Sequence, residues 1–529
     1  MTKLIKPAKR AIFFLAGVLV TLACSCKVGP DYTTPKSSVA GQWIENPAIA
    51  HSSPGVADIY WWRHFNDPVL DSLITNACQN NLSLQAAGVH VLETRAKLNQ
   101  SIGNLFPQQQ GISGQLNYSR LDDGLTSLIP GINQNYLQDE ALFSATWEMD
   151  FWGKYRRGIE SDRAMFLGSL AAYDDAMVTL IADVASTYVN IRTLQERLQV
   201  AERNLATQKE SLRIATAQFN AGETGELDVQ QATTQLAQTE SQIPQLNEAL
   251  AQNKNGLAVL LGERPDEIDG QLSGLEKIPV APTNVVVGIP KDLLRRRPDV
   301  QEAGLQAAAF SALIGVAKAN LYPSFSLSGE FGFSGNNEGN NSLSDIFNWQ
   351  SHALNAGAGL VMPIFNYGRL INQVRVQDAQ FQQAVLKYQN TVLAAQQEVE
   401  NGIASFAGEQ KALVSLNRAA ASSRRSTELA MVQYKGGQTD YTTVLTAEQA
   451  ELSVENNVAV TKGNVALGLI AIYRALGGGW EIRGDGDVIP DSVKAEMAKR
   501  TDWGKMLEPS HHLPEISPVA DAPETKEIH

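Results

Sequence analysis

The chain has 529 residues, with 43 lysines and arginines against 56 aspartates and glutamates, and a formal net charge of −13. This charge argues against a protein that binds nucleic acid nonspecifically, because such binding depends on a basic surface. Of the 3 cysteines, Cys78 alone lies beyond the N-terminal region. A single thiol cannot form an internal bridge, so we expect no disulfide to hold an exported form of the chain together.

Residues 1–25 have the pattern of a signal peptide. A basic region precedes an apolar stretch, residues 11–22, that is too short to cross a membrane as a helix. An ordinary secretory signal with incidental cysteines would give this pattern. A lipoprotein signal would give it too, with a cysteine after small residues becoming the acylated N-terminus. Both Cys26 and Cys24 qualify, so the residues alone leave the choice of cysteine open.

The chain then repeats a set of residues at a fixed distance. Seven residues of the first half reappear 215 positions later with no insertion between them: Gly153, Phe219, Gly222, Val229, Ala232, Leu261 and Gly262 correspond to Gly368, Tyr434, Gly437, Val444, Ala447, Leu476 and Gly477. Upstream the register shifts by one, so that Leu84 corresponds to Val300. This period is too long for a solenoid unit and predicts one module built twice, over residues 61–270 and 271–480. Residues 26–60 would form an extended anchor segment before the first module.

Each module contains two segments in which apolar and polar residues alternate, over residues 110–120, 139–151, 324–334 and 353–365. Alternation over about 9–11 residues is typical of a strand that crosses a membrane, although one face of a soluble sheet gives the same pattern. The polar face carries Ser, Asn, Gln and Glu, which favours a wet channel. Four strands cannot close a barrel, and an open edge is not stable in lipid. A spanning chain must therefore oligomerise, with eight strands in a dimer or twelve in a trimer.

Each module continues into a very long helical hairpin, over residues 153–262 and 368–477. Apolar residues in the first hairpin follow a three–four spacing, which predicts coiled-coil-like packing. At 1.5 Å per residue, its first helix would extend about 100 Å. The second hairpin has a weaker apolar seam and a Gly-Gly turn, so we expect it to be the hairpin that moves. Shorter helices over residues 82–105 and 298–321 could stack end to end on the return helices.

The remaining residues, 481–529, are acidic and contain several prolines, and we expect a flexible tail. His511 and His512 lie in it, without the spacing of a metal site. The sequence also has no phosphate loop, paired metal ligands or nucleophile elbow. We therefore expect neither an enzyme nor a bound metal or cofactor.

Three motifs occur in order along the chain. They are Cys26-Lys27-Val28-Gly29-Pro30-Asp31-Tyr32, then Trp61-Trp62 with Phe65-Asn66-Asp67-Pro68-Val69-Leu70, then Leu294-Arg295-Arg296-Arg297-Pro298-Asp299-Val300. Because it has these motifs in this order, the chain resembles the TolC-like outer-membrane efflux family over roughly residues 26–480. The opening motif resembles its lipoprotein branch, the NodT-type proteins that serve resistance-nodulation-division tripartite pumps.

The resemblance implies a mainly α-helical, internally duplicated chain that forms a homotrimer with a twelve-strand outer-membrane β-barrel and a twelve-helix periplasmic α-barrel. It implies an N-terminal lipid, diacylglycerol and palmitate, on Cys26 rather than Cys24. The implied partners are outer-membrane lipid, a periplasmic adaptor (membrane fusion) protein and an inner-membrane resistance-nodulation-division pump. The implied function is a passive exit duct for drugs or other small toxic compounds; the cargo itself is not predicted. A type I protein-secretion duct and a lipid-anchored periplasmic coiled-coil scaffold are the alternatives.

The resemblance also places a gate and an adaptor contact at the hairpin tips. Gly222 and Gly437 mark the two tips. Asp228 and Tyr434 match gate positions whose side chains form ion pairs or hydrogen bonds in TolC-like proteins. Asp440 is the nearest other acid, and three copies around an axis would repel one another and favour bound cations. The chain departs from TolC, which has an arginine and two aspartates there, at Thr439, Thr443 and Thr446. Capping near a helix start is the other possible role of Asp228 and Asp440.

Overall fold

The structure is a computed structural model. It describes residues 27–39, 43–44, 59–120, 135–272, 277–282, 296–336, 346, 348–484 and 486–509. The predicted signal peptide and the candidate lipidation residues Cys24 and Cys26 lie outside these residues, as do residues 510–529 of the tail.

The described residues belong to two compact units. The described residues within Met1–Pro35, Glu93–Gly168 and Ala303–Tyr388 form the first, and those within Lys36–Leu92, Ser169–Glu302 and Gln389–His529 form the second. Four helices run from one unit into the other: α3 (Leu82–Gly103), α5 (Lys154–Asn220), α9 (Pro298–Ala319) and α10 (Arg369–Lys435).

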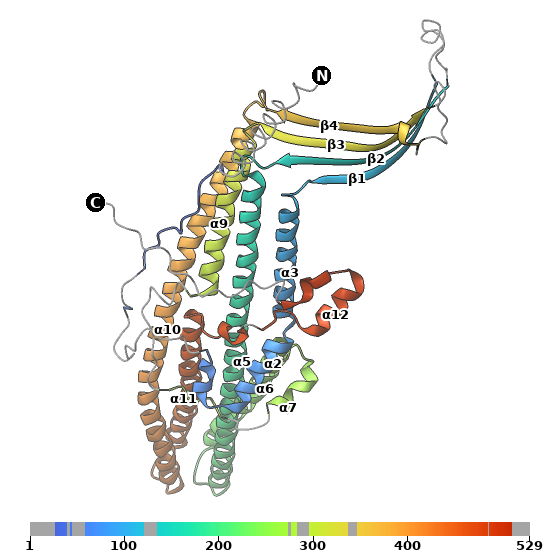
Figure 1. Ribbon diagram of the computed structural model, residues 1–529. Coiled ribbons are helices and arrows are strands. Elements are labelled where there is room, and N and C mark those ends of the chain that lie inside the picture. Colours follow the sequence, from blue (N-terminus) through green and yellow to red (C-terminus); the bar gives the residue numbers. More distant parts are fainter. Residues whose placement is uncertain are drawn as a thin grey trace, which may run out of the picture. The chain divides into compact units, whose positions relative to one another are not determined.

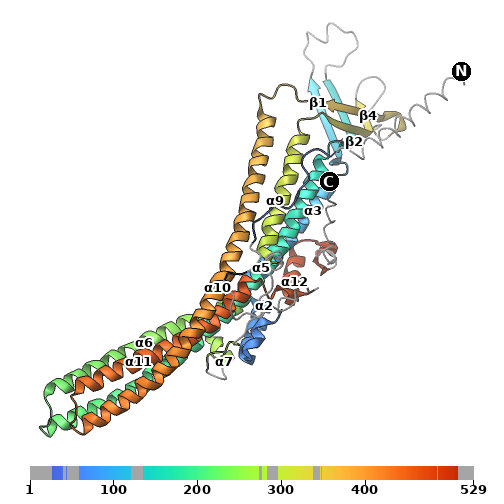
Figure 2. The ribbon, with the colours of Figure 1, turned by 90° about the vertical axis from the view of Figure 1, so that its left-hand side faces the viewer.

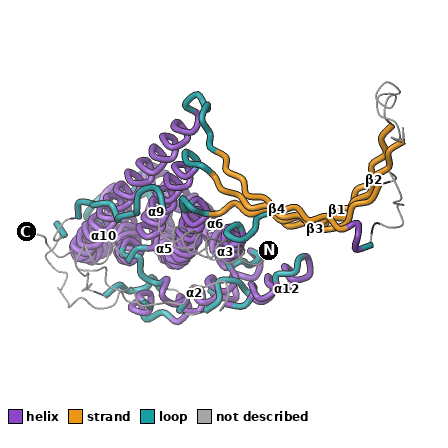
Figure 3. Tube along the Cα trace, turned by 45° about the horizontal axis from the view of Figure 1, so that its top comes forward, coloured by secondary structure: helices purple, strands orange, loops and turns teal. Residues whose placement is uncertain are grey.

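The first unit contains a four-stranded antiparallel sheet (Figure 3). Its strand order is β1-β2-β3-β4 (Figure 1). Its strands are β1 (Gln109–Arg120), β2 (Asn135–Met149), β3 (Ser324–Asn336) and β4 (His352–Val361). The sequence predicts these strands with different ends. The fourth stops at Val361 rather than residue 365, because Pro363 has no N–H to donate to a ladder. The second stops at Met149 because Asp150 turns to cap the following helix.

One face of this sheet is apolar and exposed. Its register aligns Ile112, Phe143, Phe331 and Leu354 in one row across all four strands. These side chains are 85%, 48%, 42% and 75% exposed. The opposite face carries polar rows, such as the one formed by Ser144, Glu330 and Asn355. A contiguous exposed apolar face of this kind needs an apolar environment to cover it.

The second unit contains the larger part of two helical hairpins (Figure 2). Helix α5 and α6 (Glu226–Leu261) form the first, and α10 and α11 (Tyr441–Ala475) the second; α5 and α10 have 67 residues each. Stretches of α5 and α11 are long and apolar enough to cross a membrane, but 67% of each stretch is buried inside the protein. Packing of the helices against one another therefore accounts for these apolar residues.

Glycines 215 residues apart adopt the same unusual backbone. Gly153 and Gly368 have φ of 75° and 81°, and Gly262 and Gly477 both have φ of 69°. A positive φ is unfavourable for any residue that has a Cβ, which explains why glycine stands at each of these positions. The first pair precedes the long helix of each hairpin, and the second pair ends its return helix. The two halves are thus built alike at these points.

Two further equivalent residues join the short helices to the return helices. Asn81, just before α3, accepts from the Leu84 N–H at 2.8 Å and donates to the Leu260 carbonyl at 2.9 Å, near the end of α6. Arg297, just before α9, donates to the Ala475 carbonyl at the end of α11. The Asn81 side chain therefore satisfies groups at two helix ends, and the Arg297 side chain satisfies a carbonyl at one; such groups otherwise lack partners. Arg297 also pairs with Asp299 at 2.8 Å and with Glu398 of α10 at 2.9 Å.

The C-terminal region differs from the flexible tail expected from residue 481. The described residues form η5 (Trp480–Arg483), α12 (Asp491–Arg500) and η6 (Gly504–Leu507). Val488 and Ile489 are each 2% exposed, and Arg483 donates to Asp174 of α5 at 3.0 Å. The expectation was wrong for residues 486–509, because this short acidic segment still carries apolar residues that the second unit buries. The remaining elements are η1 (Trp61–Phe65), α2 (Pro68–Asn80), η2 (Pro265–Glu267), α7 (Ile268–Gln271) and η4 (Trp349–Ser351).

Replacing Gly88 by alanine is expected to release this C-terminal segment. A Cβ on Gly88 would lie 2.0 Å from the Val488 carbonyl oxygen, so that backbone would have to move. Trypsin should then cleave within α12 faster, by about tenfold or more if docking limits access. Gly103→Ala in the same helix is the control, since a Cβ there meets nothing within 4 Å. Equal cleavage of the two variants would contradict the expectation.

Candidate functional site at the hairpin tips

The two hairpin tips are built from the same turn. In the first, Gly222 has φ of 77° and the Glu223 N–H donates to the Gln218 carbonyl at 2.9 Å. In the second, Gly437 has φ of 65° and the Gln438 N–H donates to the Gln433 carbonyl at 2.9 Å. This is the Schellman arrangement, in which a left-handed glycine ends a helix and satisfies its last carbonyls. Both glycines are exposed, and a Cβ on either would meet nothing within 4 Å.

An apolar cluster joins the two hairpins just behind the tips. It consists of Ile214, Ala215, Ala232, Ala430, Tyr434, Tyr441 and Val444. Tyr434 and Tyr441 are each 1% exposed, and their rings meet edge to face with centroids 5.4 Å apart. The cluster draws on all four helices, so it holds the second hairpin against the first.

Tyr434 also makes a polar contact between the hairpins. Its hydroxyl donates to Asp228 of α6 at 3.0 Å, and its backbone carbonyl accepts from Gln218 of α5 at 3.2 Å. Burial and the neighbouring Asp228 carboxylate raise the pKa of Tyr434 to about 12, so the hydroxyl stays protonated and remains a donor. The structure thus brings together Asp228 and Tyr434, two of the three gate residues named from the sequence.

Asp440 has a different place. Its exposed carboxylate accepts from the N–H and the hydroxyl of Thr443, both at 3.2 Å, and so caps the start of α11. Thr443 in turn accepts from the Thr439 hydroxyl at 2.8 Å. Thr439 and Thr443 therefore take part in a local cap.

A buried polar stripe between α5 and α11 lies farther from the tips. The Ser211 hydroxyl donates to Glu448, and the Asn204 amide donates to Glu455 at 3.4 Å. Asn204 and Ser211 are seven residues apart on α5, and Glu448 and Glu455 are seven residues apart on α11. Seven residues is the heptad spacing of a coiled-coil seam. Burial raises the pKa of Glu448, which is 1% exposed, and the negative charge of the neighbouring Glu451 also raises it. Sequence reasoning missed this stripe, although polar residues at seam positions of both helices could have revealed it.

The profile of a family described as outer membrane efflux protein matches residues 73–263 and 289–478. The chain belongs to this family. The match confirms the resemblance drawn from the motifs.

Three relatives are similar to the chain along most of their length. The chain is 29% identical to the solvent efflux pump outer membrane protein SrpC of Pseudomonas putida, over 86% of this chain and 96% of SrpC. It is 29% identical to nodulation protein T of Rhizobium leguminosarum bv. viciae, over 88% and 93% of the two chains. It is 28% identical to the probable outer membrane lipoprotein SilC of Salmonella typhimurium, over 89% and 97%.

Solved structures of outer-membrane channels share the fold. The outer-membrane channel OprN is 32% identical, with a TM-score of 0.79 over 86% of this chain and 100% of OprN. The Neisseria gonorrhoeae MtrE channel, in its open state, is 26% identical, with a TM-score of 0.72 over 86% and 99% of the chains. These matches confirm a TolC-like, largely helical channel fold.

This protein is therefore an outer-membrane channel component of an efflux system. Its relatives are transport channels rather than enzymes. Among the residues that the structure describes, no group of three or more His, Cys, Asp or Glu side chains could hold a metal ion.

Proposed function

We propose that three copies of this chain form a passive exit duct through the outer membrane. The observation that carries the proposal is the sheet, with its exposed apolar face and with β1 and β4 at its two edges. In hydrocarbon, each unpaired backbone group costs several kcal/mol, so these edges need strands from other copies. Three copies would supply twelve strands and close a barrel, with lipid on the apolar face and water on the polar one. The resemblance to TolC-like proteins favours three copies over two.

In this proposal, the duplicated hairpins continue the duct as a periplasmic tunnel of twelve helices. An inner-membrane resistance-nodulation-division pump supplies the energy, and a periplasmic adaptor binds the exposed tips at Gly222 and Gly437. The cargo is a drug or another small toxic compound. The relative SrpC is named for solvent efflux. A lipid-anchored scaffold that does not span would leave the apolar sheet face in water, which disfavours that alternative.

The proposed duct is tested by extracting the full chain in mild detergent and reconstituting it in planar bilayers. We expect a heat-resistant trimer with β-sheet signal in circular dichroism and ion-conducting steps in the bilayer. A monomeric, wholly helical extract without conductance would rule the duct out. An oligomer with two copies would support a spanning protein but contradict the twelve-strand barrel.

We further propose that the mature N-terminus is Cys26 with diacylglycerol and palmitate attached, with Cys24 as the other candidate. The relative SilC is described as a lipoprotein, which supports an anchor. Cys26→Ser should abolish labelling with radioactive palmitate, while Cys24→Ser leaves it unchanged. Unchanged labelling of the first variant together with loss in the second would move the anchor to Cys24.

The gate in this proposal consists of Asp228, Tyr434 and Asp440. The Tyr434–Asp228 hydrogen bond supports the first two, since it ties one hairpin to the other near the tip. Asp440 contributes through its exposed charge, which three copies would bring together around the axis. Block of the bilayer current by divalent cations should then weaken in Asp440→Ala.

A further inference from the structure

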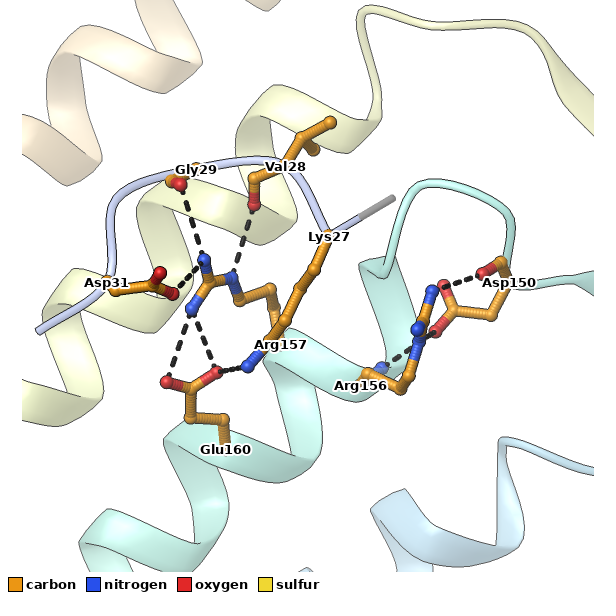
Figure 4. Close-up of polar contacts among 8 residues, drawn as sticks. All are labelled: Lys27, Val28, Gly29, Asp31, Asp150, Arg156, Arg157 and Glu160. Atoms are coloured by element: carbon orange, nitrogen blue, oxygen red, sulfur yellow. Dashed lines mark hydrogen bonds and ion pairs between the residues drawn. The ribbon is translucent and has the colours of Figure 1, made fainter. Parts of the chain in front are cut away.

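Arg157, in the first turns of α5, is almost completely buried and uses all of its donors. Its Nε donates to the Val28 carbonyl at 3.2 Å, and its Nη2 donates to the Gly29 carbonyl at 3.2 Å and to Asp31 at 2.8 Å (Figure 4). Its Nη1 donates to both carboxylate oxygens of Glu160, at 2.9 and 3.2 Å. Arginine has five N–H groups, so the guanidinium is fully satisfied although its side chain is 1% exposed.

Three of these five bonds go to one short segment, Lys27–Asp31, which lies far from Arg157 in the sequence. The segment has further contacts with the same unit. The Val28 N–H donates to the Trp152 carbonyl at 3.1 Å, and Lys27 pairs with Glu160. The segment is therefore held by its backbone and by charges at both of its ends.

The fit of the segment Lys27–Asp31 against α9 also depends on two glycines that face each other. Gly29 has φ of 102°, and a Cβ there would lie 2.5 Å from the Gly315 Cα. A Cβ on Gly315 would lie 2.8 Å from the Val28 carbonyl oxygen and from the Arg157 Cγ. The backbone of the segment thus passes against the backbone of α9, and neither position admits a side chain. The close approach makes the site specific for this segment, because it excludes any residue other than glycine at position 29.

The equivalent place in the second half has no such covering among the described residues. There Asn372 stands 215 residues after Arg157, and its amide oxygen accepts from Arg375 at 3.1 Å on the same helix. Tyr367, equivalent to Trp152, is 100% exposed. A turn from strand to long helix therefore does not itself require a docked segment.

We infer that Arg157, Glu160 and Gly315 form a specific binding site for the chain's own segment Lys27–Asp31. Because Lys27 immediately follows Cys26, the site holds the anchor one residue from the folded unit, beside the turn between β2 and α5. This part of the inference rests on the proposed acylation of Cys26. Docking of the segment then fixes the position of the lipid anchor at this turn. Arg157 is a positioning residue, since it acts on the lipid through the segment.

The test uses full-length protein labelled with palmitate and exposed to trypsin in detergent. Cleavage after Lys27 separates the acylated dipeptide from the chain, and a docked segment resists it. We expect Arg157→Ala and Gly29→Ala to lose the label at least tenfold faster than the parent. Arg157→Lys should also lose it faster, because an ammonium has three donors and cannot replace the five of a guanidinium. Asn372→Ala, at the equivalent place, should behave as the parent does.

Each outcome bears on one claim. Gly29→Ala leaves the helices unchanged, so it tests docking even where Arg157→Ala fails to yield a heat-resistant oligomer. Rapid cleavage of the parent, or equal rates for Gly29→Ala and the parent, would overturn the binding site. Absence of palmitate before trypsin would instead refute the acylation, and cleavage would then be followed by mass spectrometry of the N-terminus, with the same rates expected.

Discussion

Replacing Tyr434 by phenylalanine is expected to raise the open probability of the reconstituted channel by roughly tenfold. The change keeps the ring that packs against Tyr441 and removes the hydroxyl that donates to Asp228. Hydrogen bonds to charged groups contribute about 1.5–3 kcal/mol, and Asp228 is partly exposed, so the lower end applies. About 1.4 kcal/mol corresponds to a factor of ten in an equilibrium constant. Single-channel recording in planar bilayers measures the effect.

The control for this variant is Thr234→Val in α6. It also removes a hydroxyl near the tips, but that hydroxyl donates to the Gln230 carbonyl of its own helix. It should leave the open probability as in the parent. A double variant, Tyr434→Phe with Asp228→Ala, should add little to the single variants, because both remove the same bond. Additive effects, or a parent-like Tyr434→Phe channel, would remove this pair from the gate.

Replacing Glu448 by glutamine is expected to make the packing of α11 against α5 much less dependent on pH. Burial raises the pKa of Glu448, so the packed hairpins favour its neutral form. Its contribution is therefore complete below the ordinary pKa of a glutamate and is lost as the pH rises through the raised value. An uncompensated buried charge costs on the order of several kcal/mol. In the parent, amide hydrogen exchange of residues 441–455, corrected for intrinsic rates, should be at least tenfold faster at pH 8 than at pH 5.

Glutamine stays neutral, so Glu448→Gln should keep the slow exchange at both pH values. The groups that act on Glu448 are Ser211 of α5, which donates to it, and Glu451 of the same helix, which repels it. Glu428→Gln is the matched control, because Glu428 is exposed and pairs with Arg425 on its own helix. If the pH dependence of the Glu448→Gln protein equals that of the parent, another group controls the packing.

The sequence predicted the strands and long helices because their patterns are long and regular. Alternation fixed which residues of β1 to β4 share a face, and the repeated glycines located the turns. It predicted the strand ends less well, since Pro363 and the cap formed by Asp150 act through single residues. It missed the fold of residues 486–509, because burial of Val488 depends on Gly88, some 400 residues away in the chain.

The candidate site was predicted in part. The family resemblance named Tyr434 and Asp228 as gate residues near the tips, and the structure joins them by a hydrogen bond. The carboxylate of Asp440 accepts from Thr443 of its own helix, which is the capping role stated as the alternative. A role of Asp440 in a gate stays a prediction. The Ser211–Glu448 and Asn204–Glu455 pairs were missed, because each pairs residues more than 200 positions apart and heptad polarity alone does not say which helices meet.

The open edges of the sheet also constrain how the protein can be made. A single protomer has a complete ladder between its own strands, yet β1 and β4 keep backbone groups that need a neighbour. Entering the bilayer alone would place those groups in hydrocarbon, and waiting in the periplasm would leave the apolar rows in water. On the proposed barrel of several copies, membrane insertion and subunit association would therefore be a single step of biogenesis.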